Sequence, residues 1–154
     1  MNITHPAHQE MLYAMLDNNV DFILVGGYAV IYHGYVRTTG DMDIWLRPDN
    51  TNKLKLLEVF KLLGFDPEGV KIIDDKDFTS VVVFHVGDVP ERIDFLTKLS
   101  GLNFQEAWEN CEFLNAPNHR IPVLHLNDLL ANKLITNRLK DQADIEALRK
   151  IKNR

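Results

Sequence analysis

Two aspartates, Asp41 and Asp43, are separated by a single residue in a stretch, residues 41–46, whose alternating pattern is typical of a β-strand. Residues two apart on a strand project from the same face with Cα atoms about 6.5–7 Å apart, so the carboxylates could converge on one or two hard cations. Mg²⁺ prefers oxygen ligands and is commonly bound by one or two carboxylates together with substrate phosphates. The pair therefore predicts a site for Mg²⁺ or Mn²⁺, and its alternative is a solvated strand face.

A pair of glycines precedes these aspartates. Gly26-Gly27 ends the apolar run of residues 22–25, which predicts a buried strand, and thirteen residues separate it from Asp41. Where a strand turns into a helix, missing side chains let backbone N–H groups approach a phosphate, and the helix dipole favours the negative charge. A phosphate cradle beside a carboxylate pair predicts a site for a nucleoside triphosphate. The glycines alone would also fit an ordinary tight turn.

Asp94 is the candidate third carboxylate. It interrupts the apolar strand expected over residues 91–97, which could lie beside residues 41–46. In a two-metal arrangement a third carboxylate would hold the metal ion that activates the attacking hydroxyl group, and it could also orient or deprotonate that hydroxyl. The alternative is a surface carboxylate paired with Arg92.

Two basic residues are candidates for binding phosphate. Arg37 could clamp a phosphate through its planar guanidinium group, or it could hold its loop by pairing with a nearby acid. Lys133 lies on or beside the apolar face of the helix expected over residues 127–138. There it could reach back to a triphosphate, or it could extend its ammonium group to solvent along the apolar face.

Three further residues of these segments have a structural interpretation. Trp45 shares the face of the acidic pair, where it could border the nucleotide or cap the edge of the core. Arg138 and Lys140 are interpreted as solvated or structural residues that pair with Asp141 or Asp144.

Hydrophobic periodicity predicts helices and strands in alternation around these residues. Asn50 or Thr51 could cap one of the helices, and residues 111–124 are expected to be irregular or β. The order predicts a mixed sheet with helices packed against it, which is an α/β or α+β fold. Helices are expected over residues 6–17, 28–35, 52–63, 103–110, 127–138 and 141–151, and strands over residues 22–25, 41–46, 79–86 and 91–97.

The length of 154 residues predicts a single domain over residues 1–154, with a core at about residues 20–98 and a C-terminal helical part at about residues 126–152. No apolar stretch approaches the roughly 20 residues of a membrane helix, and the N-terminus lacks the features of a secretory signal. We therefore expect a cytoplasmic protein without a membrane partner. With one cysteine, Cys111, an intramolecular disulfide is excluded.

The charge and the motifs exclude two other classes of protein. The net charge of -5 argues against broad, sequence-independent binding to nucleic acid, although a local basic patch stays open. The chain has no GxxxxGK[ST] sequence, so the chemistry of P-loop ATPases is excluded.

Taken together, the glycine pair and the aspartates resemble the signature of the nucleotidyltransferases of the DNA polymerase β superfamily. That signature is an apolar residue followed by Gly and then Gly or Ser, a spacer of similar length, Asp-apolar-Asp, and a third acidic residue on a later strand. The chain matches it with Val25-Gly26-Gly27, Asp41-Met42-Asp43-Ile44 and Asp94.

Within that superfamily the chain looks most like the small bacterial branch, which includes lincosamide-type antibiotic nucleotidyltransferases and abortive-infection toxin nucleotidyltransferases. The Gly-Gly form of the turn and Arg37-Thr38-Thr39 before the acidic pair carry this likeness. The end of the chain is similar to the helical tail of that branch. Its matching residues are Asp128-Leu129-Leu130, Lys133, Arg138-Leu139-Lys140-Asp141 and Asp144.

The resemblance implies a mixed-sheet nucleotidyltransferase core with flanking helices and a C-terminal helical tail. It implies a transferase that moves a nucleoside monophosphate from an NTP, with ATP as the expected substrate, to a hydroxyl acceptor and releases pyrophosphate. Many members have Ser where this chain has Gly27, so only backbone contacts to phosphate are expected at that position. The implied metal-binding and catalytic residues are Asp41, Asp43 and Asp94, with Mg²⁺ or Mn²⁺, and the implied nucleotide-binding residues are Gly26, Gly27, Arg37 and Lys133.

Other functions remain open at this point. One alternative is a non-catalytic domain of the same fold that binds a nucleotide or a partner. Another is the toxin of a toxin–antitoxin pair, which would modify tRNA or protein and bind an antitoxin. The acceptor could be a small molecule, a tRNA or a protein, and a homodimer could complete its binding site.

Overall fold

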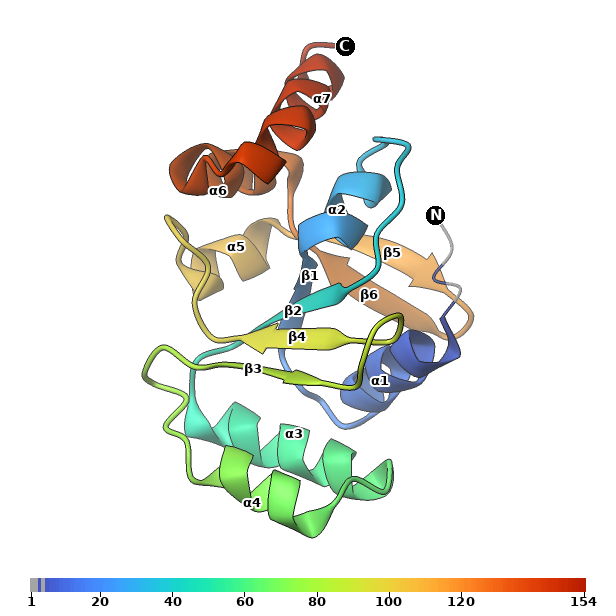
Figure 1. Cartoon of the computed structure of the whole chain (residues 1–154), viewed down its shortest axis with the longest axis vertical. Coiled ribbons are helices and arrows are strands. Elements are labelled where there is room, and N and C mark those ends of the chain that lie inside the picture. Colours follow the sequence, from blue (N-terminus) through green and yellow to red (C-terminus); the bar gives the residue numbers. More distant parts are fainter. Residues whose placement is uncertain (1–2, 4) are drawn as a thin grey trace.

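A six-stranded mixed sheet forms the centre of the computed structural model, which describes residue 3 and residues 5–154 (Figure 1). The strands are β1 (Phe22–Val25), β2 (Met42–Leu46), β3 (Val83–Val86), β4 (Ile93–Leu96), β5 (Glu112–Ala116) and β6 (His119–Val123). Their order in space is β3-β4-β2-β1-β6-β5. β1 pairs antiparallel with β2 and parallel with β6, β2 pairs parallel with β4, and each edge strand is antiparallel to its neighbour.

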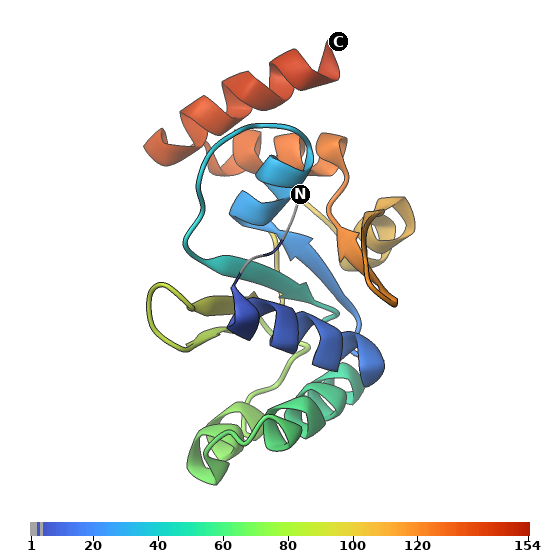
Figure 2. The same ribbon diagram turned by 90° about the vertical axis from the view of Figure 1, so that its right-hand side faces the viewer.

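The helices lie around this sheet. In the described residues they are α1 (Pro6–Asp17), α2 (Gly26–Tyr32), α3 (Asn50–Leu62), α4 (Pro67–Asp74), α5 (Phe104–Asn110), α6 (Leu126–Thr136), the 3₁₀ turn η1 (Leu139–Asp141) and α7 (Gln142–Lys152). α6 and α7 lie together beside α2 at one end of the molecule, and α3 and α4 lie at the opposite end (Figures 1 and 2). Among the helices in the described part of the chain, none has the length and apolar character needed to cross a bilayer.

The predicted mixed sheet is confirmed, and most elements occur where periodicity predicts them. α1 and the strand over residues 22–25 have the expected bounds, whereas α2 begins at Gly26, two residues before the expected start. β3 begins only at Val83, since residues 78–80 form a turn and residues 81–82 lie outside the strand. Asp77 holds that turn by accepting hydrogen bonds from the Thr79 backbone N–H at 3.0 Å and from the Thr79 hydroxyl at 2.7 Å.

The sequence-based expectation missed α4. Asp66 caps this helix by accepting a hydrogen bond from the Glu68 backbone N–H at 3.2 Å, and Pro67 occupies its first turn. Of its eight residues only Val70 and Ile73 are buried, so the apolar periodicity is too short to predict a helix.

Two local details also differ from expectation. Asp49, rather than Asn50 or Thr51, caps α3 by accepting a hydrogen bond from the Asn52 backbone N–H at 2.7 Å. Residues 111–124 contain the hairpin of β5 and β6, which resolves the choice between irregular and β structure.

Aromatic side chains pack on both faces of the sheet. On one face Phe95 of β4 stacks on Phe84 of β3, with ring centroids 5.1 Å apart, and Phe60 of α3 packs edge-on against Phe95 at 5.7 Å. On the other face Trp45 of β2 packs edge-on against Phe104 of α5 at 5.1 Å. Because Trp45 is 1% exposed, it belongs to the core, and the interpretation that it borders a nucleotide is wrong.

The register of three strands places the residues singled out in the sequence. Val25, the last residue of β1, pairs with Asp43 of β2, and Asp43 pairs in turn with Asp94 of β4. Because β1 is antiparallel to β2 while β4 is parallel to it, the end of β1 meets the starts of β2 and β4 at one edge. The glycine turn that follows β1 is therefore brought next to Asp43 and Asp94.

We expect Phe95→Ala to lower the free energy of unfolding by about 3–5 kcal/mol, because the Phe95 ring is fully buried between Phe84 and Phe60. Urea unfolding followed by circular dichroism measures this change. Leu62→Ala serves as the control, since Leu62 is 69% exposed on α3 and its loss should change stability by no more than about 0.5 kcal/mol. Equal losses in the two variants would contradict the packing described above.

Candidate active site

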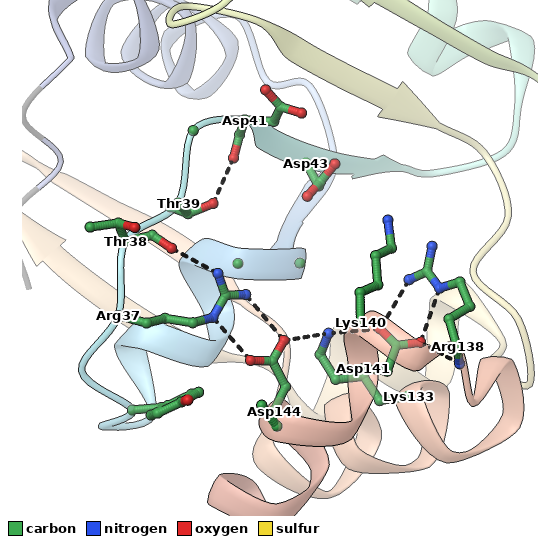
Figure 3. Close-up of a pocket in the computed structure, with 15 residues that line it drawn as sticks. Arg37, Thr38, Thr39, Asp41, Asp43, Lys133, Arg138, Lys140, Asp141 and Asp144 are labelled. Carbon is green, nitrogen blue, oxygen red and sulfur yellow. Dashed lines mark hydrogen bonds and ion pairs between the residues drawn. The ribbon is translucent and has the colours of Figure 1, made fainter.

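A pocket of about 490 Å³ opens beside this edge of the sheet (Figure 3). Its walls are the starts of α2 and β2, the loop that joins them, and the helical segment formed by α6, η1 and α7. All predicted site residues except Asp94 line it. The lining residues are Gly26, Gly27, Tyr35, Arg37, Thr38, Thr39, Gly40, Asp41, Asp43, Lys133, Arg138, Lys140, Asp141, Ala143 and Asp144.

Asp94 lies next to the pocket lining. Its register with Asp43 means that the two carboxylates leave the same face of neighbouring strands. Arg92 Nε donates a hydrogen bond to Asp94 Oδ1 at 3.0 Å, so the ion pair considered as its alternative role is present as well. In the described part of the chain, no group of three or more acidic, histidine or cysteine side chains is arranged to hold a metal ion. Asp41, Asp43 and Asp94 lie at the same edge of the sheet, but by themselves they do not form a complete metal-binding site.

Asp43 is crowded by protein atoms and by its acidic neighbours. Burial raises the pKa of Asp43 to about 6, and the negative charges of Asp94 and Asp41 contribute to the rise. The positive charges of Lys140 and Lys133 act in the opposite direction. The ionised form of Asp43 therefore costs free energy that a bound cation or a proton would offset.

The start of α2 packs directly against Asp43. Gly26 has a φ of +64°, in the left-handed region, and a Cβ atom at this position would collide with the Asp43 carboxylate. Because α2 begins at Gly26, both glycines belong to its first turn, where backbone N–H groups have no partner within the helix. The glycine pair thus allows a close approach between backbone and carboxylate, which an ordinary tight turn would not require.

Thr39 fills the space beside Gly27. A Cβ atom on Gly27 would collide with the Thr39 hydroxyl and would lie 2.8 Å from the Thr39 Cβ. The hydroxyl donates a hydrogen bond to the Asp41 carbonyl at 3.2 Å, and Thr39 lines the pocket. Gly27 itself offers only backbone groups, as expected from the sequence, and the loop places the Thr39 hydroxyl beside it.

Asp144 of α7 binds both cations that the sequence singled out. Arg37 Nε lies 3.0 Å from Asp144 Oδ1, and Arg37 Nη2 donates to Asp144 Oδ2 at 3.1 Å. Lys133 Nζ lies 3.0 Å from Asp144 Oδ2 and 3.5 Å from Asp141 Oδ1. Lys133 and Asp144 are each 6% exposed, so Lys133 does not extend to solvent as its alternative role required. Arg37 pairs with an acid, which is one of the two roles predicted for it.

Asp141 fixes the turn between α6 and α7. It is 1% exposed and accepts hydrogen bonds from the Arg138 backbone N–H at 3.0 Å, from Arg138 Nε at 2.9 Å and from the Thr136 hydroxyl at 2.9 Å. Burial alone would raise the pKa of Asp141, but the hydrogen bonds from Arg138 and Thr136 outweigh it and hold the pKa well below its ordinary value. Arg138 is thus a structural partner of Asp141, as predicted.

Lys140 is exposed, in agreement with its interpretation as a solvated residue, but the pairing predicted for it is wrong. It pairs with neither Asp141 nor Asp144, whose ion pairs within the described residues involve only Arg37, Lys133 and Arg138. Its side chain instead points from η1 across the pocket toward Asp43 (Figure 3). No periodicity could have indicated this direction, because η1 is a single 3₁₀ turn between two helices.

Comparisons with known proteins address the family and the fold. A family model described as a nucleotidyltransferase of unknown function (DUF6036) matches residues 6–153. Six chains of solved structures match, and one of them is a crystal structure of the lincosamide antibiotic adenylyltransferase LnuA with lincomycin bound. It is 16% identical in sequence, superposes with a TM-score of 0.56, and the match covers 98% of this chain and 99% of that one. No curated protein matches the chain. The fold class and the resemblance predicted from the sequence are confirmed.

Gly27→Ser should destabilise the protein by about 1–3 kcal/mol, because the added side chain collides with Thr39. The double variant Gly27→Ser/Thr39→Gly removes the colliding group and should recover part of this loss. Thermal unfolding of the single and double variants, with Thr39→Gly alone as the reference, measures the coupling between the two positions. Additive effects would show that the two residues are not in contact.

Asp43→Asn should make the metal-free protein more stable at pH 8 by about 1–3 kcal/mol, since it removes a carboxylate whose pKa is raised to about 6. Because the pKa of Asp43 is higher in the folded state, the folded protein still holds a proton on this carboxylate at pH values between about 4 and 6, where the unfolded chain has lost it. Relative to Asp43→Asn, the stability of the unmodified protein should therefore fall as the pH rises from about 4 to about 6. Below pH 4 the difference between the two proteins should disappear.

Unfolding in EDTA at several pH values measures this effect. Asp88→Asn is the matched control, because Asp88 is exposed in the loop between β3 and β4 and lies outside the pocket. The idea fails if Asp43→Asn is the less stable protein at pH 8.

Proposed function

The chain belongs to a family of nucleotidyltransferases, and on that premise we propose that it transfers a nucleoside monophosphate from an NTP to an acceptor hydroxyl with release of pyrophosphate. The observation that carries the proposal is the in-register pair of Asp43 and Asp94 beside a glycine turn, at a pocket whose opposite wall is cationic. The match over residues 6–153 supports the expectation of one domain.

The acidic edge of the pocket fits a divalent cation. Asp43 is packed against the backbone of Gly26 and crowded by two other carboxylates, and the positive charges of Lys140 and Lys133 offset this effect only in part. Asp41 and Asp43 would hold Mg²⁺ or Mn²⁺, and Asp94 would be a third ligand. Because these side chains do not form a closed set of ligands, phosphate oxygens of the substrate would complete the coordination. Bound there, the cation would neutralise charge on the triphosphate and help to activate the acceptor hydroxyl.

The residues of the chain would act mainly by binding and orienting the substrate. The free N–H groups in the first turn of α2, at Gly26 and Gly27, would donate hydrogen bonds to phosphate oxygens. Arg37 and Lys133 would provide fixed positive charge, because Asp144 holds both in one orientation. Asp94 would orient the acceptor hydroxyl or accept its proton. Such preorganised charges are typically the main source of rate acceleration in phosphoryl transfer.

ATP is the nucleotide that we propose. The support is the likeness to a solved structure described as an adenylyltransferase, which was determined with its antibiotic lincomycin bound. A small molecule with a free hydroxyl group is correspondingly the acceptor to test first. Transfer to RNA or to protein is the alternative outcome of the same experiment.

Asp43→Asn should reduce nucleotidyl transfer by at least about 100-fold, because it removes the charge at the centre of the acidic edge. The assay supplies each α-labelled NTP and Mg²⁺ together with a cell extract separated into small molecules, RNA and protein. Label that enters one fraction only when Mg²⁺ is present would identify both the nucleotide and the class of acceptor.

Asp88→Asn, which makes the same chemical change outside the pocket, should retain full activity. The proposal is overturned if Asp43→Asn transfers label as fast as the unmodified protein. Binding of ATP without transfer to any fraction would favour a non-catalytic nucleotide-binding domain.

A further inference from the structure

The helical wall of the pocket, together with Arg37 of the loop before β2, carries more positive than negative charge. Three cations, Arg37, Lys133 and Arg138, are paired with the carboxylates of Asp141 and Asp144. Three positive charges against two negative ones leave this cluster with a formal charge of +1. Lys140 adds a further positive charge at the same wall, opposite the carboxylates of β2.

The paired cations cannot turn toward a ligand without giving up buried contacts. Asp144 has contacts with Arg37 and Lys133, and both Asp144 and Lys133 are buried. If Lys133 moved away, Asp144 would lose part of its compensation inside the protein, which is costly for a buried carboxylate. These cations therefore act best as a fixed wall.

The ammonium group of Lys140 has no partner among the described residues, although hydrogen bonds hold the backbone that carries it. Its neighbour Asp141 is held by hydrogen bonds from Arg138 and Thr136, which anchor η1. Lys140 itself is exposed, and its ammonium group makes no ion pair or hydrogen bond with the residues that the structure describes. The side chain points across the pocket toward Asp43 (Figure 3).

We propose that Lys140 binds a phosphate group of the NTP, as a mobile cation in front of the fixed wall formed by Arg37, Lys133 and Asp144. The inference rests on the function proposed above and adds a residue to it. A flexible chain with a compact ammonium group suits this role, because it can follow the phosphates without breaking a protein contact. Its positive charge also opposes the repulsion around Asp43 when no nucleotide is bound, and this second effect has to be separated from phosphate binding.

The test compares binding of ATP, inorganic tripolyphosphate and adenosine to the full chain by calorimetry, in Mg²⁺ and without an acceptor. Lys140→Ala should weaken the binding of ATP and tripolyphosphate by roughly 10- to 100-fold and leave the binding of adenosine unchanged. Lys140→Arg, which keeps the charge, should restore part of the affinity. In the transfer assay Lys140→Ala should raise KM for ATP more than it lowers kcat.

Lys55→Ala is the matched control, because Lys55 is exposed on α3 at the far end of the molecule and its loss changes the net charge equally. The inference is overturned if Lys140→Ala binds ATP within about twofold of the unmodified protein, or if ATP and adenosine lose affinity equally. The proposed function is judged separately, by whether the unmodified protein transfers label in the assay described above. An unmodified protein that binds none of the four NTPs would contradict both.

Discussion

The crowding of negative charge around Asp43 is the constraint on which the site depends. The Asp43 carboxylate lies against the backbone of Gly26, and Asp43 is in register with Val25 of β1 on one side and with Asp94 of β4 on the other. Burial and the neighbouring carboxylates raise its pKa, so the folded protein maintains an unfavourable charge at this edge of the sheet. The large core on both faces of the sheet stabilises the fold that holds this arrangement in place. Residues that lower stability in this way are common where a protein binds a cation or a charged substrate.

The helical segment formed by α6, η1 and α7 places positively charged side chains on the other side of the pocket, opposite the carboxylates. Asp144 joins α7 to Arg37 in the loop before β2 and to Lys133 in α6, so one buried carboxylate links three parts of the chain. The pocket thus has an acidic wall on the sheet and a cationic wall on the helices, with formal charges suited to a metal ion and a polyphosphate. The family match identifies the chain as a nucleotidyltransferase, and phosphoryl transfer in general depends on compensation of the charge on the phosphates.

Residues close together in the sequence were the ones whose placement could be predicted. The alternation over residues 41–46 predicted β2, although the strand begins at Met42 and Asp41 precedes it, and the apolar run of β1 predicted a buried strand before the glycines. α4 was missed because only two of its residues reach the core, and Trp45 was ambiguous because both faces of the sheet are covered at its position. A pattern of alternation shows which side chains share a face, but it does not show whether a helix lies over that face.

The sequence by itself determined the type of fold, the glycine turn and the acidic pair, because these features depend on spacings of a few residues that strand and helix geometry translate directly into positions. The tertiary structure alone decided which cations are paired and which is free. Arg37 and Asp144 are 107 positions apart, and no local periodicity relates them. The same holds for the Thr39 hydroxyl beside Gly27, whose place depends on the path of a loop. Contacts of this kind arise from packing between elements, so only the folded chain separates the fixed cations from Lys140.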